Sequence, residues 1–564
     1  MKKDKMIIYS VLPRLFGNRK FRRSPGGSKK INGCGKFNDF TTEVLEHYRD
    51  MGITHMWYIG VIEHATRTDY SNYGIRRDHP AVVKGEAGSP YAIKDYYDVD
   101  PDLAVDIDKR MEEFEQLIAR THEAGLKVII DFVPNHLSRE YHSDAAPEGI
   151  KDFGEDDNRH IAFSPDNNYY YIPGEELRGN FDFHAGWDEP YMENPARATG
   201  NDKFDSRVSI TDWYETVKLN YGVDYAGGHV PHFDPLPDTW LKMRDILLYW
   251  AGKGVDGFRC DMAEMVPVEF WHWVIPQVKE VSPSIVFIAE IYNPGLYREY
   301  IYNGGFDYLY DKVGLYDTLR AVTCGTESAS VITQRWQSLD GLQSRMLNFM
   351  ENHDEQRLAS DFFAGSGEKG KPAMIISATM NTNPAMIYFG QEIGERGMDV
   401  EGFSGKDGRT TIFDYWTIRS VKRYYNEGHI GQELLTDKER LLLNFYTRLL
   451  NICNEEKAIS QGEFFDLTYA NLGGWAYNEH RQYAYLRYYE GELILVAVNF
   501  DDYPVNVSIN IPRHAFEYLG VKPSEIVMAE DLLTGTVERL SLTYHHPVSL
   551  RLEGKGGKIL KLRW

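Results

Sequence analysis

The stretch Gly257-Phe258-Arg259-Cys260-Asp261 decides the fold prediction, because it has the composition of a short buried strand that carries an arginine and a carboxylate. Side chains alternate between the two faces of a strand, so Arg259 and Asp261 are expected on one face and Cys260 on the other. A neighbouring arginine favours the ionised form of a carboxyl group and fixes its orientation. The segment therefore predicts a positioned carboxylate at the end of a strand, with a purely structural ion pair as the alternative.

Three other apolar runs end in the same way, with polar residues directly after a strand-like segment. The clusters are Asp131-Phe-Val-Pro-Asn-His136, then Glu290, then Glu351-Asn-His353-Asp354. In a (β/α)8 barrel the functional residues gather at the C-terminal ends of the parallel strands. Four such clusters in succession predict an α/β fold, a (β/α)8 TIM barrel, with an active site at that end. The alternative is that these polar residues are unconnected surface or capping groups.

In order and spacing, the four segments resemble the conserved regions of the α-amylase family of retaining glycoside hydrolases. The resemblance spans nearly the whole chain and implies three parts. Residues 1–136 and 235–460 are expected to form the catalytic barrel, residues 137–234 an inserted domain B after the third strand, and residues 461–564 a C-terminal antiparallel β-sandwich. The sequence pattern agrees, because strands and helices alternate up to Asp131, the alternation stops between 137 and 234, and closely spaced strands follow Tyr483.

The same resemblance implies roles for individual residues. Cleavage with retention needs a carboxylate nucleophile and a protonated carboxylic acid about 5 to 5.5 Å apart. Asp261 is expected to be the nucleophile, Glu290 the general acid/base, and Asp354 a third carboxylate that holds sugar hydroxyls. Substrate contacts are expected from Tyr91, His136, Arg259 and His353. For Tyr91 the alternative is ordinary packing.

We also make predictions for three residues outside this set. Asp131 is expected to lie beneath the site. Trp187 and Trp213, both in the inserted segment, are candidates for outer sugar subsites, although packing of a small subdomain is the favoured interpretation.

No cofactor or metal is predicted. Asn135 corresponds to a calcium ligand in many relatives, but the position four after the expected nucleophile, often histidine, is Met265, and the segment that closes domain B contains His232. A thioether is a poor ligand for a hard cation. We expect no calcium there, and expect packing of Met265 and hydrogen bonds from His232 to hold the junction instead.

Composition excludes several classes of partner. The formal net charge of −22 over 564 residues disfavours nucleic acid, whereas a neutral α-glucan or maltooligosaccharide is not repelled. No apolar run is long enough to cross a membrane. The four cysteines are widely spaced, which predicts free thiols in a reducing compartment, and the first residues lack the features of a secretory signal. A cytoplasmic location is expected, although a chain trimmed of a leader would have the same sequence.

We predict a retaining enzyme that hydrolyses α-1,4-glucosidic bonds through a covalent intermediate on Asp261. Two alternatives stay open at this stage. One is a transglycosylase, in which a sugar hydroxyl replaces water as the acceptor. The other is a non-catalytic binding or interaction protein, which the complete set of Asp261, Glu290 and Asp354 disfavours.

Overall fold

A closed barrel of eight parallel strands forms the centre of the molecule. The computed structural model describes residues 5–563. The order around the barrel is β1-β2-β5-β14-β15-β16-β17-β18, and β18 pairs with β1 to close it. The bounds of these strands are Ile7–Val11, His55–Tyr58, Lys127–Phe132, Gly257–Cys260, Val286–Ala289, Tyr308–Tyr310, Met346–Phe349 and Ala385–Tyr388. The predicted (β/α)8 barrel is therefore confirmed.

The barrel strands form because nearly every residue in them is apolar or buried. In β1, all five residues are buried, which is typical of a parallel strand covered on both faces. Gly257 begins β14, where a Cβ atom would lie 3.1 Å from the carbonyl oxygen of Val286 and 3.2 Å from Ile129. Glycine thus permits the close approach of three neighbouring strands at the point from which Arg259 and Asp261 project.

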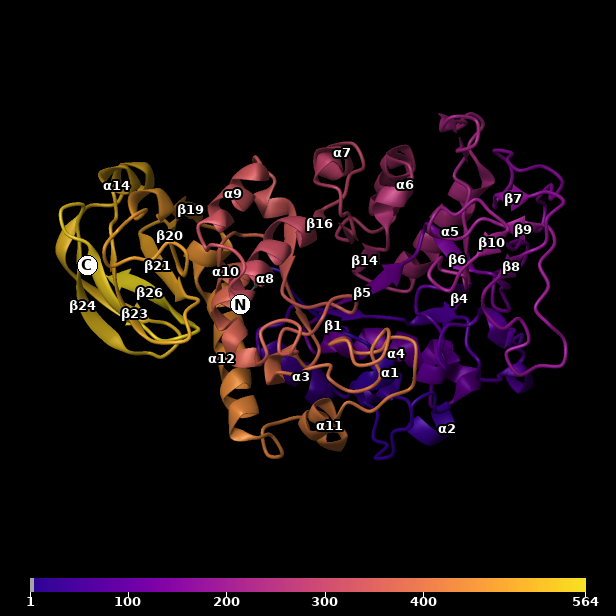
Figure 1. Cartoon of the computed structure of the whole chain (residues 1–564), viewed down its shortest axis with the longest axis horizontal. Helices are drawn as coiled ribbons and strands as arrows, with labels where there is room; N and C mark the ends of the chain where they lie inside the picture. The colour runs from indigo at the N-terminus through magenta and orange to yellow at the C-terminus, as the bar shows by residue number, and fades with distance from the viewer. Residues whose placement is uncertain (1–4, 564) are drawn as a thin grey trace.

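Helices surround the barrel and alternate with its strands (Figure 1). The longest, α12, begins with a capping box in which Thr436 and Glu439 satisfy each other's backbone N–H groups. The α-helices before the C-terminal sheets are α1 (Pro13–Phe16), α2 (Lys29–Asn32), α3 (Thr42–Asp50), α4 (Arg110–Glu123), α5 (Asp238–Gly252), α6 (Val268–Val281), α7 (Tyr297–Tyr302), α8 (Asp317–Cys324), α9 (Val331–Ser338), α10 (Lys371–Thr379), α11 (Arg419–Tyr425), α12 (Asp437–Glu455) and α13 (Lys457–Ser460).

Short strands replace this alternation between β5 and α5, at the opposite end of the molecule from the C-terminal sheets (Figure 1). They have their own small apolar core, which includes Leu177, Val208 and Tyr214. Their bounds are β6 (His136–Ser138), β7 (Tyr171–Ile172), β8 (Arg178–Gly179), β9 (Ala196–Arg197), β10 (Arg207–Val208), β11 (Thr216–Lys218), β12 (Val223–Asp224) and β13 (Val230–Pro231). A separate antiparallel hairpin of β3 (Ile62–His64) and β4 (Ile93–Val99) lies between β2 and α4.

Two antiparallel sheets pack face to face at the C-terminal end. The larger has the order β19-β20-β21-β26-β23-β24, and the smaller pairs β22 with β25. Their shared core contains Leu495 and Leu560 from the first sheet and Val507 and Leu550 from the second, so the unit is a β-sandwich, as predicted. The bounds are β19 (Glu463–Asp466), β20 (Gln482–Tyr489), β21 (Glu492–Asn499), β22 (Val505–Ile509), β23 (Ser524–Asp531), β24 (Val537–Leu542), β25 (Val548–Leu552) and β26 (Gly556–Arg563), with α14 (Arg513–Leu519) between β22 and β23. We keep the division at residues 136/137, 234/235 and 460/461 as a proposal.

No helix within residues 5–563 is both long enough and apolar enough to cross a bilayer. The four cysteines are all free.

Arg487 connects the sandwich to the barrel. It lies in β20 with 1% of its surface exposed, and its guanidinium donates to the carbonyl oxygens of Met380, Ala458, Ile459 and Gly462 at 2.7 to 3.0 Å. Met380 follows α10 of the barrel, whereas Ala458 and Ile459 belong to α13. Burial lowers the pKa of Arg487 to about 10. One side chain therefore satisfies backbone acceptors on both sides of the domain junction.

Replacing Arg487 with methionine should destabilise this junction, because the four carbonyl groups lose their donor while the apolar volume is kept. We expect the free energy of unfolding to fall by on the order of 3 kcal/mol, which is the usual cost of removing one partner from a buried polar network. Scanning calorimetry should show a lower melting temperature. Arg551→Met is the matched control, because the Arg551 side chain is 62% exposed and, within residues 5–563, its one ion pair is with Glu553. Equal melting temperatures for the two variants would contradict the assigned role of Arg487.

Candidate functional site

The predicted site residues meet at the C-terminal end of the barrel. Asp261 directly follows β14 and Glu290 directly follows β15, while Asp354 lies five residues beyond the end of β17. Arg259 in β14 is the register partner of Asp131 in β5. Parallel strands end at the same rim, so residues far apart in the sequence converge there.

Arg259 is the centre of the polar network. Its Nη1 donates to Asp261 Oδ1 at 2.7 Å and to Asp131 Oδ1 at 3.3 Å, and its Nε donates to the hydroxyl of Tyr310 at 3.1 Å. Nη2 lies 2.7 Å from Glu290 Oε2, at an angle that makes the contact electrostatic rather than a hydrogen bond. Only 1% of Arg259 is exposed. One buried cation therefore faces three carboxyl groups.

The two carboxyl groups nearest the expected chemistry have different surroundings. Burial raises the pKa of Glu290 to about 7, and the charges of Asp261 and Asp354 add to the effect of burial while Arg259 opposes it. Glu290 also accepts hydrogen bonds from the backbone N–H of Met262 and from the hydroxyl of Tyr292. Burial raises the pKa of Asp261 as well, but there Arg259 both attracts the charge and donates a hydrogen bond. Glu290 is thus suited to carry a proton near neutral pH, and Asp261 to carry a charge.

Asp354 belongs to a second polar group. Its Oδ2 lies 3.0 Å from His353 Nε2. Burial opposes ionisation of both residues, yet their mutual attraction outweighs it, so the pKa of Asp354 is lowered and that of His353 is raised. His353 also lies 2.6 Å from the hydroxyl of Tyr91, whose ring stacks on the imidazole with the centroids 5.1 Å apart. The geometry therefore favours a charged His353–Asp354 pair braced by Tyr91.

A different environment surrounds His136. Its Nε2 lies 4.0 Å from Asp261 Oδ2, and its ring lies 5.3 Å from that of Trp213. Burial and the nearby ammonium of Lys218 lower the pKa of His136 to about 3. His136 is therefore neutral at physiological pH and is able to exchange hydrogen bonds with a hydroxyl group.

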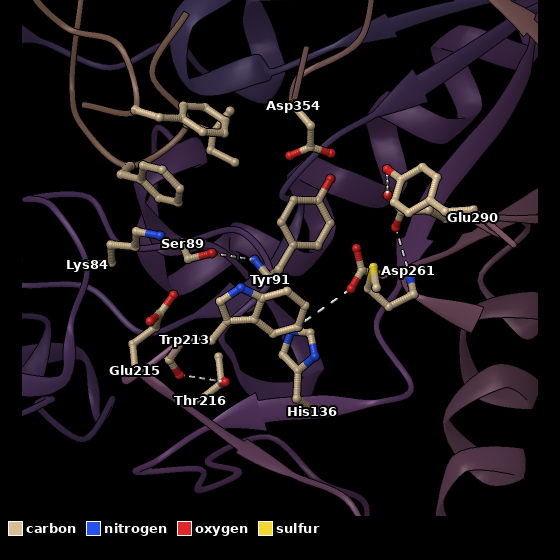
Figure 2. Close-up of a pocket in the computed structure, with 15 residues that line it drawn as sticks. Lys84, Ser89, Tyr91, His136, Trp213, Glu215, Thr216, Asp261, Glu290 and Asp354 are labelled. Carbon is tan, nitrogen blue, oxygen red and sulfur yellow. Dashed lines mark hydrogen bonds and ion pairs between the residues drawn. The ribbon is translucent and has the colours of Figure 1, made fainter. Parts of the chain in front are cut away.

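These side chains surround a cavity of about 320 Å³. In Figure 2, Asp261 and Glu290 lie on one side of the Tyr91 ring, with Asp354 above it and Trp213 and His136 below. Phe403, Ile412 and Phe413, from the segment after β18, form an apolar wall. The full lining is Lys84, Ser89, Tyr91, His136, Trp213, Glu215, Thr216, Asp261, Met262, Glu290, Tyr292, Asp354, Phe403, Ile412 and Phe413. Aromatic faces beside a few polar groups suit a ligand that has both apolar faces and hydroxyl edges.

Not every predicted residue reaches the cavity. Tyr91, His136, Asp261, Glu290 and Asp354 line it, whereas Arg259 and His353, each 1% exposed, lie behind its wall. This placement favours a positioning role for those two residues over direct contact with a ligand. Asp131 also lies behind the wall, where it accepts a hydrogen bond from Trp57.

Sequence reasoning missed or undervalued three residues. Tyr292 contacts Glu290, and its position two residues later, on the same side of an extended segment, is a signal that could have indicated it. Trp213 lines the cavity, although packing was the favoured interpretation. Trp187 does pack elsewhere, against Arg77 and His79.

The third missed residue is Lys218, which lies at the junction of the barrel and the inserted strands. Its Nζ donates to Asn135 Oδ1 at 2.7 Å and lies 2.5 Å from Asp202 Oδ1, and its side chain is 2% exposed. Lys218 ends a strand that pairs with β6, directly opposite His136. The signal in the sequence that could have indicated Lys218 was a lysine within a buried strand.

The structure contradicts the expectation that His232 makes hydrogen bonds at the junction. His232 is exposed, and its side chain packs on Phe163 without a hydrogen bond among the described residues.

Comparison with known proteins agrees with this geometry. The family model for the α-amylase catalytic domain matches residues 18–462. "Alpha-amylase 3" of Dictyoglomus thermophilum is 24% identical over 438 residues, which cover 74% of this chain and 73% of that one. The "Alpha-1,4-glucan:maltose-1-phosphate maltosyltransferase" of Cereibacter sphaeroides is 24% identical over 306 residues, 51% of this chain and 39% of that one.

The fold is similar to solved structures over its full length. A maltogenic α-amylase from Thermotoga neapolitana superimposes with a TM-score of 0.63 at 19% sequence identity, and the alignment covers 100% of both chains. Since the family model covers most of the chain and the barrel has the expected constellation at its rim, the chain belongs to the α-amylase family and is a glycoside hydrolase enzyme of that family.

Proposed function

We propose that this protein hydrolyses α-1,4-glucosidic bonds of starch-type glucans or maltooligosaccharides, with retention of configuration and a covalent glycosyl intermediate on Asp261. One observation carries the proposal. Glu290, whose pKa is raised to about 7, and Asp261, whose carboxylate accepts a hydrogen bond from Arg259, face the same cavity. This is the pair of protonation states that glycosidases with two carboxyl groups use, and retention of configuration is proposed from the resemblance to the α-amylase family.

The proposed reaction has two steps. Asp261 attacks the anomeric carbon while the proton of Glu290 moves to the leaving oxygen, so that a glycosyl ester forms and a free sugar hydroxyl departs. Glu290, now ionised, then removes a proton from water, whose oxygen attacks the same carbon and releases Asp261. Arg259 keeps Asp261 oriented, and Tyr292 and the N–H of Met262 keep Glu290 oriented.

Other cavity residues are proposed to bind the sugar. Asp354 and neutral His136 offer acceptors and donors to hydroxyl groups, while Tyr91 and Trp213 offer ring faces. His353 acts through Asp354 and Tyr91, which it contacts.

A transglycosylase is the second candidate, because one of the similar proteins is named as a maltosyltransferase. The same first step serves both activities, and the second differs only in whether water or a sugar hydroxyl attacks the ester.

We further propose that Lys218 takes the place of the family's calcium ion. Its ammonium lies between Asn135 and Asp202, so that the oxygen that corresponds to a calcium ligand in many relatives already accepts from a cation. A second cation at this position would be repelled.

Digestion of maltoheptaose tests the activity and the nucleophile together. Wild-type protein should release shorter maltooligosaccharides, and Asp261→Asn should lower the rate by several orders of magnitude while keeping the fold, because the amide is nearly isosteric but cannot form the ester. Chromatography of the products over time is the measurement. Products longer than the substrate would favour the transglycosylase, and full activity in Asp261→Asn would exclude this nucleophile.

The pKa of Glu290 predicts the alkaline limb of the pH profile. The first step needs protonated Glu290, so kcat/KM should fall as the pH rises through about 7, while the ionised fraction of Asp261 limits it at low pH. In Glu290→Ala that alkaline limb should disappear. An activated aryl glycoside should then lose far less rate than maltoheptaose in the first step, because its leaving group needs no proton. Equal losses for the two substrates would mean that another group is the acid.

Lys218→Met should lower the melting temperature, because Asn135 and Asp202 lose a buried donor. The free energy of unfolding is expected to fall by about 2 kcal/mol. This is less than the usual cost of breaking a fully buried ion pair, because the side chain of Asp202 is 38% exposed. Lys151→Met, which removes an exposed pair with Asp156, should leave the melting temperature unchanged. Bound calcium that is lost on Asn135→Ala would contradict the proposal that Lys218 occupies this position.

A further inference from the structure

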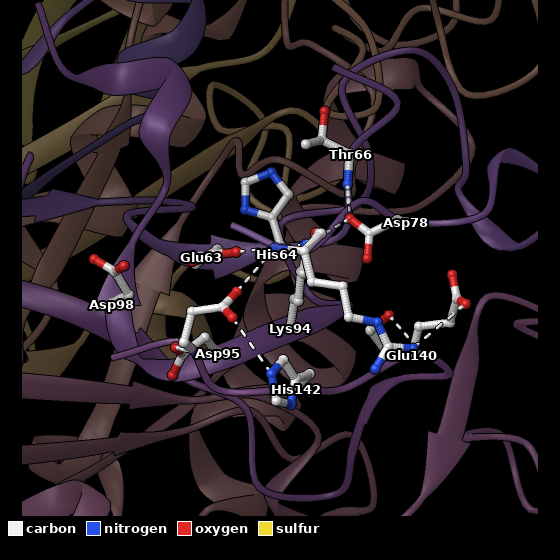
Figure 3. A network of polar contacts seen from close by, with 12 residues as sticks. Glu63, His64, Thr66, Asp78, Lys94, Asp95, Asp98, Glu140 and His142 are labelled. Atoms are coloured by element: carbon white, nitrogen blue, oxygen red, sulfur yellow. Dashed lines mark hydrogen bonds and ion pairs between the residues drawn. The ribbon is translucent and has the colours of Figure 1, made fainter. Parts of the chain in front are cut away.

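Three buried carboxylates converge on the β3–β4 hairpin, apart from the residues that line the catalytic cavity. One oxygen from each of Glu63, Asp95 and Asp98 lies within 4.8 Å of those of the other two. Their exposures are 1%, 0% and 2%. Figure 3 shows the three groups next to one another beside Lys94. Such a grouping is costly unless a cation or a proton neutralises it.

The hydrogen bonds of these residues leave one oxygen without a partner. Asp95 accepts from the backbone N–H groups of Tyr97, Asp144 and Ala145 and from the hydroxyl of Ser143. Asp98 accepts from Val99 N–H and from the guanidinium of Arg110. Glu63 differs, because its Oε1 lies 3.7 Å from the ammonium of Lys94 while its Oε2, fully buried, has no hydrogen-bond partner within the described chain.

The charges around the cluster do not balance. Asp78 pairs with the same ammonium of Lys94 at 3.3 Å, so four carboxylates face two cations, Lys94 and Arg110. If all are ionised, the group carries a net charge of −2.

We propose that Glu63, Asp95 and Asp98 bind one divalent cation of the size of calcium. Carboxylate oxygens are the ligands of hard cations, and the charge of one such ion equals the imbalance. Ca–O bonds of about 2.3 to 2.6 Å place opposite ligands about 4.6 to 5.2 Å apart, so three oxygens within 4.8 Å of one another fit a single coordination shell. The alternative way to neutralise the cluster is a proton on Glu63, which would remove only one of its two excess negative charges.

The ion would fix the hairpin that carries a cavity residue. Tyr91 lies two residues before β4, and Asp95 in β4 holds the backbone of residues 144 and 145. Asp98 is tied through Arg110 to the start of α4. A cation here would therefore join the hairpin, the segment after β6 and a barrel helix, at a place different from Asn135 and Lys218.

Calcium titration of chelator-treated protein tests the site. Isothermal titration calorimetry with CaCl2, and separately with MgCl2, should show one calcium ion per chain for the wild type and none at this site for Glu63→Gln, whose amide removes the unpartnered charged oxygen. Glu140→Gln is the matched control, because Glu140 is a half-buried carboxylate of the same region that lies outside the cluster. It should bind calcium as the wild type does. Calcium should also raise the melting temperature of the wild type and of Glu140→Gln.

Two outcomes would overturn the proposal: no calcium or magnesium binding by the wild type at millimolar concentration, or the same stoichiometry in Glu63→Gln. A second measurement does not depend on the variant. Tb³⁺ bound at the cluster should give luminescence sensitised by the adjacent Tyr96 and Tyr97, and excess Ca²⁺ should remove it. Absence of a calcium-sensitive terbium signal in the wild type would equally overturn the site and leave a proton on Glu63 as the explanation.

Discussion

One guanidinium determines the arrangement at the rim of the barrel. Arg259 lies within 3.3 Å of carboxylate oxygens from three different barrel strands or their ends, and a single positive charge cannot compensate three negative ones in a buried place. The network is therefore stable only if one carboxyl group keeps its proton. Both Asp261 and Glu290 lie 2.7 Å from the guanidinium, but Asp261 accepts a hydrogen bond from it whereas Glu290 does not, and burial raises the pKa of Glu290 to about 7, so Glu290 is the group suited to keep the proton.

The surroundings of Arg259 make this arrangement rigid. The aromatic rings of Trp57, Tyr91 and Tyr310 lie 5.4 to 5.5 Å from its guanidinium carbon, so the cation is held by π faces as well as by carboxylates. These rings come from separate segments of the chain. Loss of any of them would widen the space in which Arg259 is confined, and the carboxyl groups of Asp261 and Glu290 would then be oriented less precisely.

Local sequence was sufficient to predict the barrel and the convergence of its polar rim. Strand periodicity placed Arg259 and Asp261 on one face, and the rule that barrel strands end at a common rim brought Glu290 and Asp354 to them. The same reasoning could not tell cavity walls from the layer behind them, so Arg259 and His353 were expected to touch substrate although both are buried. That distinction depends on side-chain packing between segments distant in the chain.

The errors concerned contacts made by the inserted segment. Lys218 and Trp213 belong to a region of two- and three-residue strands, whose pairing is set by tertiary contacts rather than by a repeating pattern. The resemblance to the family directed attention to Met265 and His232, whereas the ammonium that contacts Asn135 belongs to Lys218, in a strand that the pattern did not single out. A change in ion chemistry at a junction can be compensated at a residue far from the one that was replaced.

The apolar wall of the cavity, formed by Phe403, Ile412 and Phe413, comes from the connection between β18 and α11, which contributes no strand to the barrel. Within that connection, Arg409 donates to the carbonyl oxygen of Asp354 at 2.8 Å, while the backbone N–H of Arg357 and the amide of Gln356 donate to the carbonyl oxygens of Gly408 and Asp407, so residues 407–409 are tied to the segment after β17. These hydrogen bonds end on backbone atoms of the loop or on Arg409, so the side chains of Phe403, Ile412 and Phe413 can change without removing them. Divergence among proteins built in this way can therefore begin in this loop, with new preferences for substrate length arising while the bond-breaking apparatus stays the same.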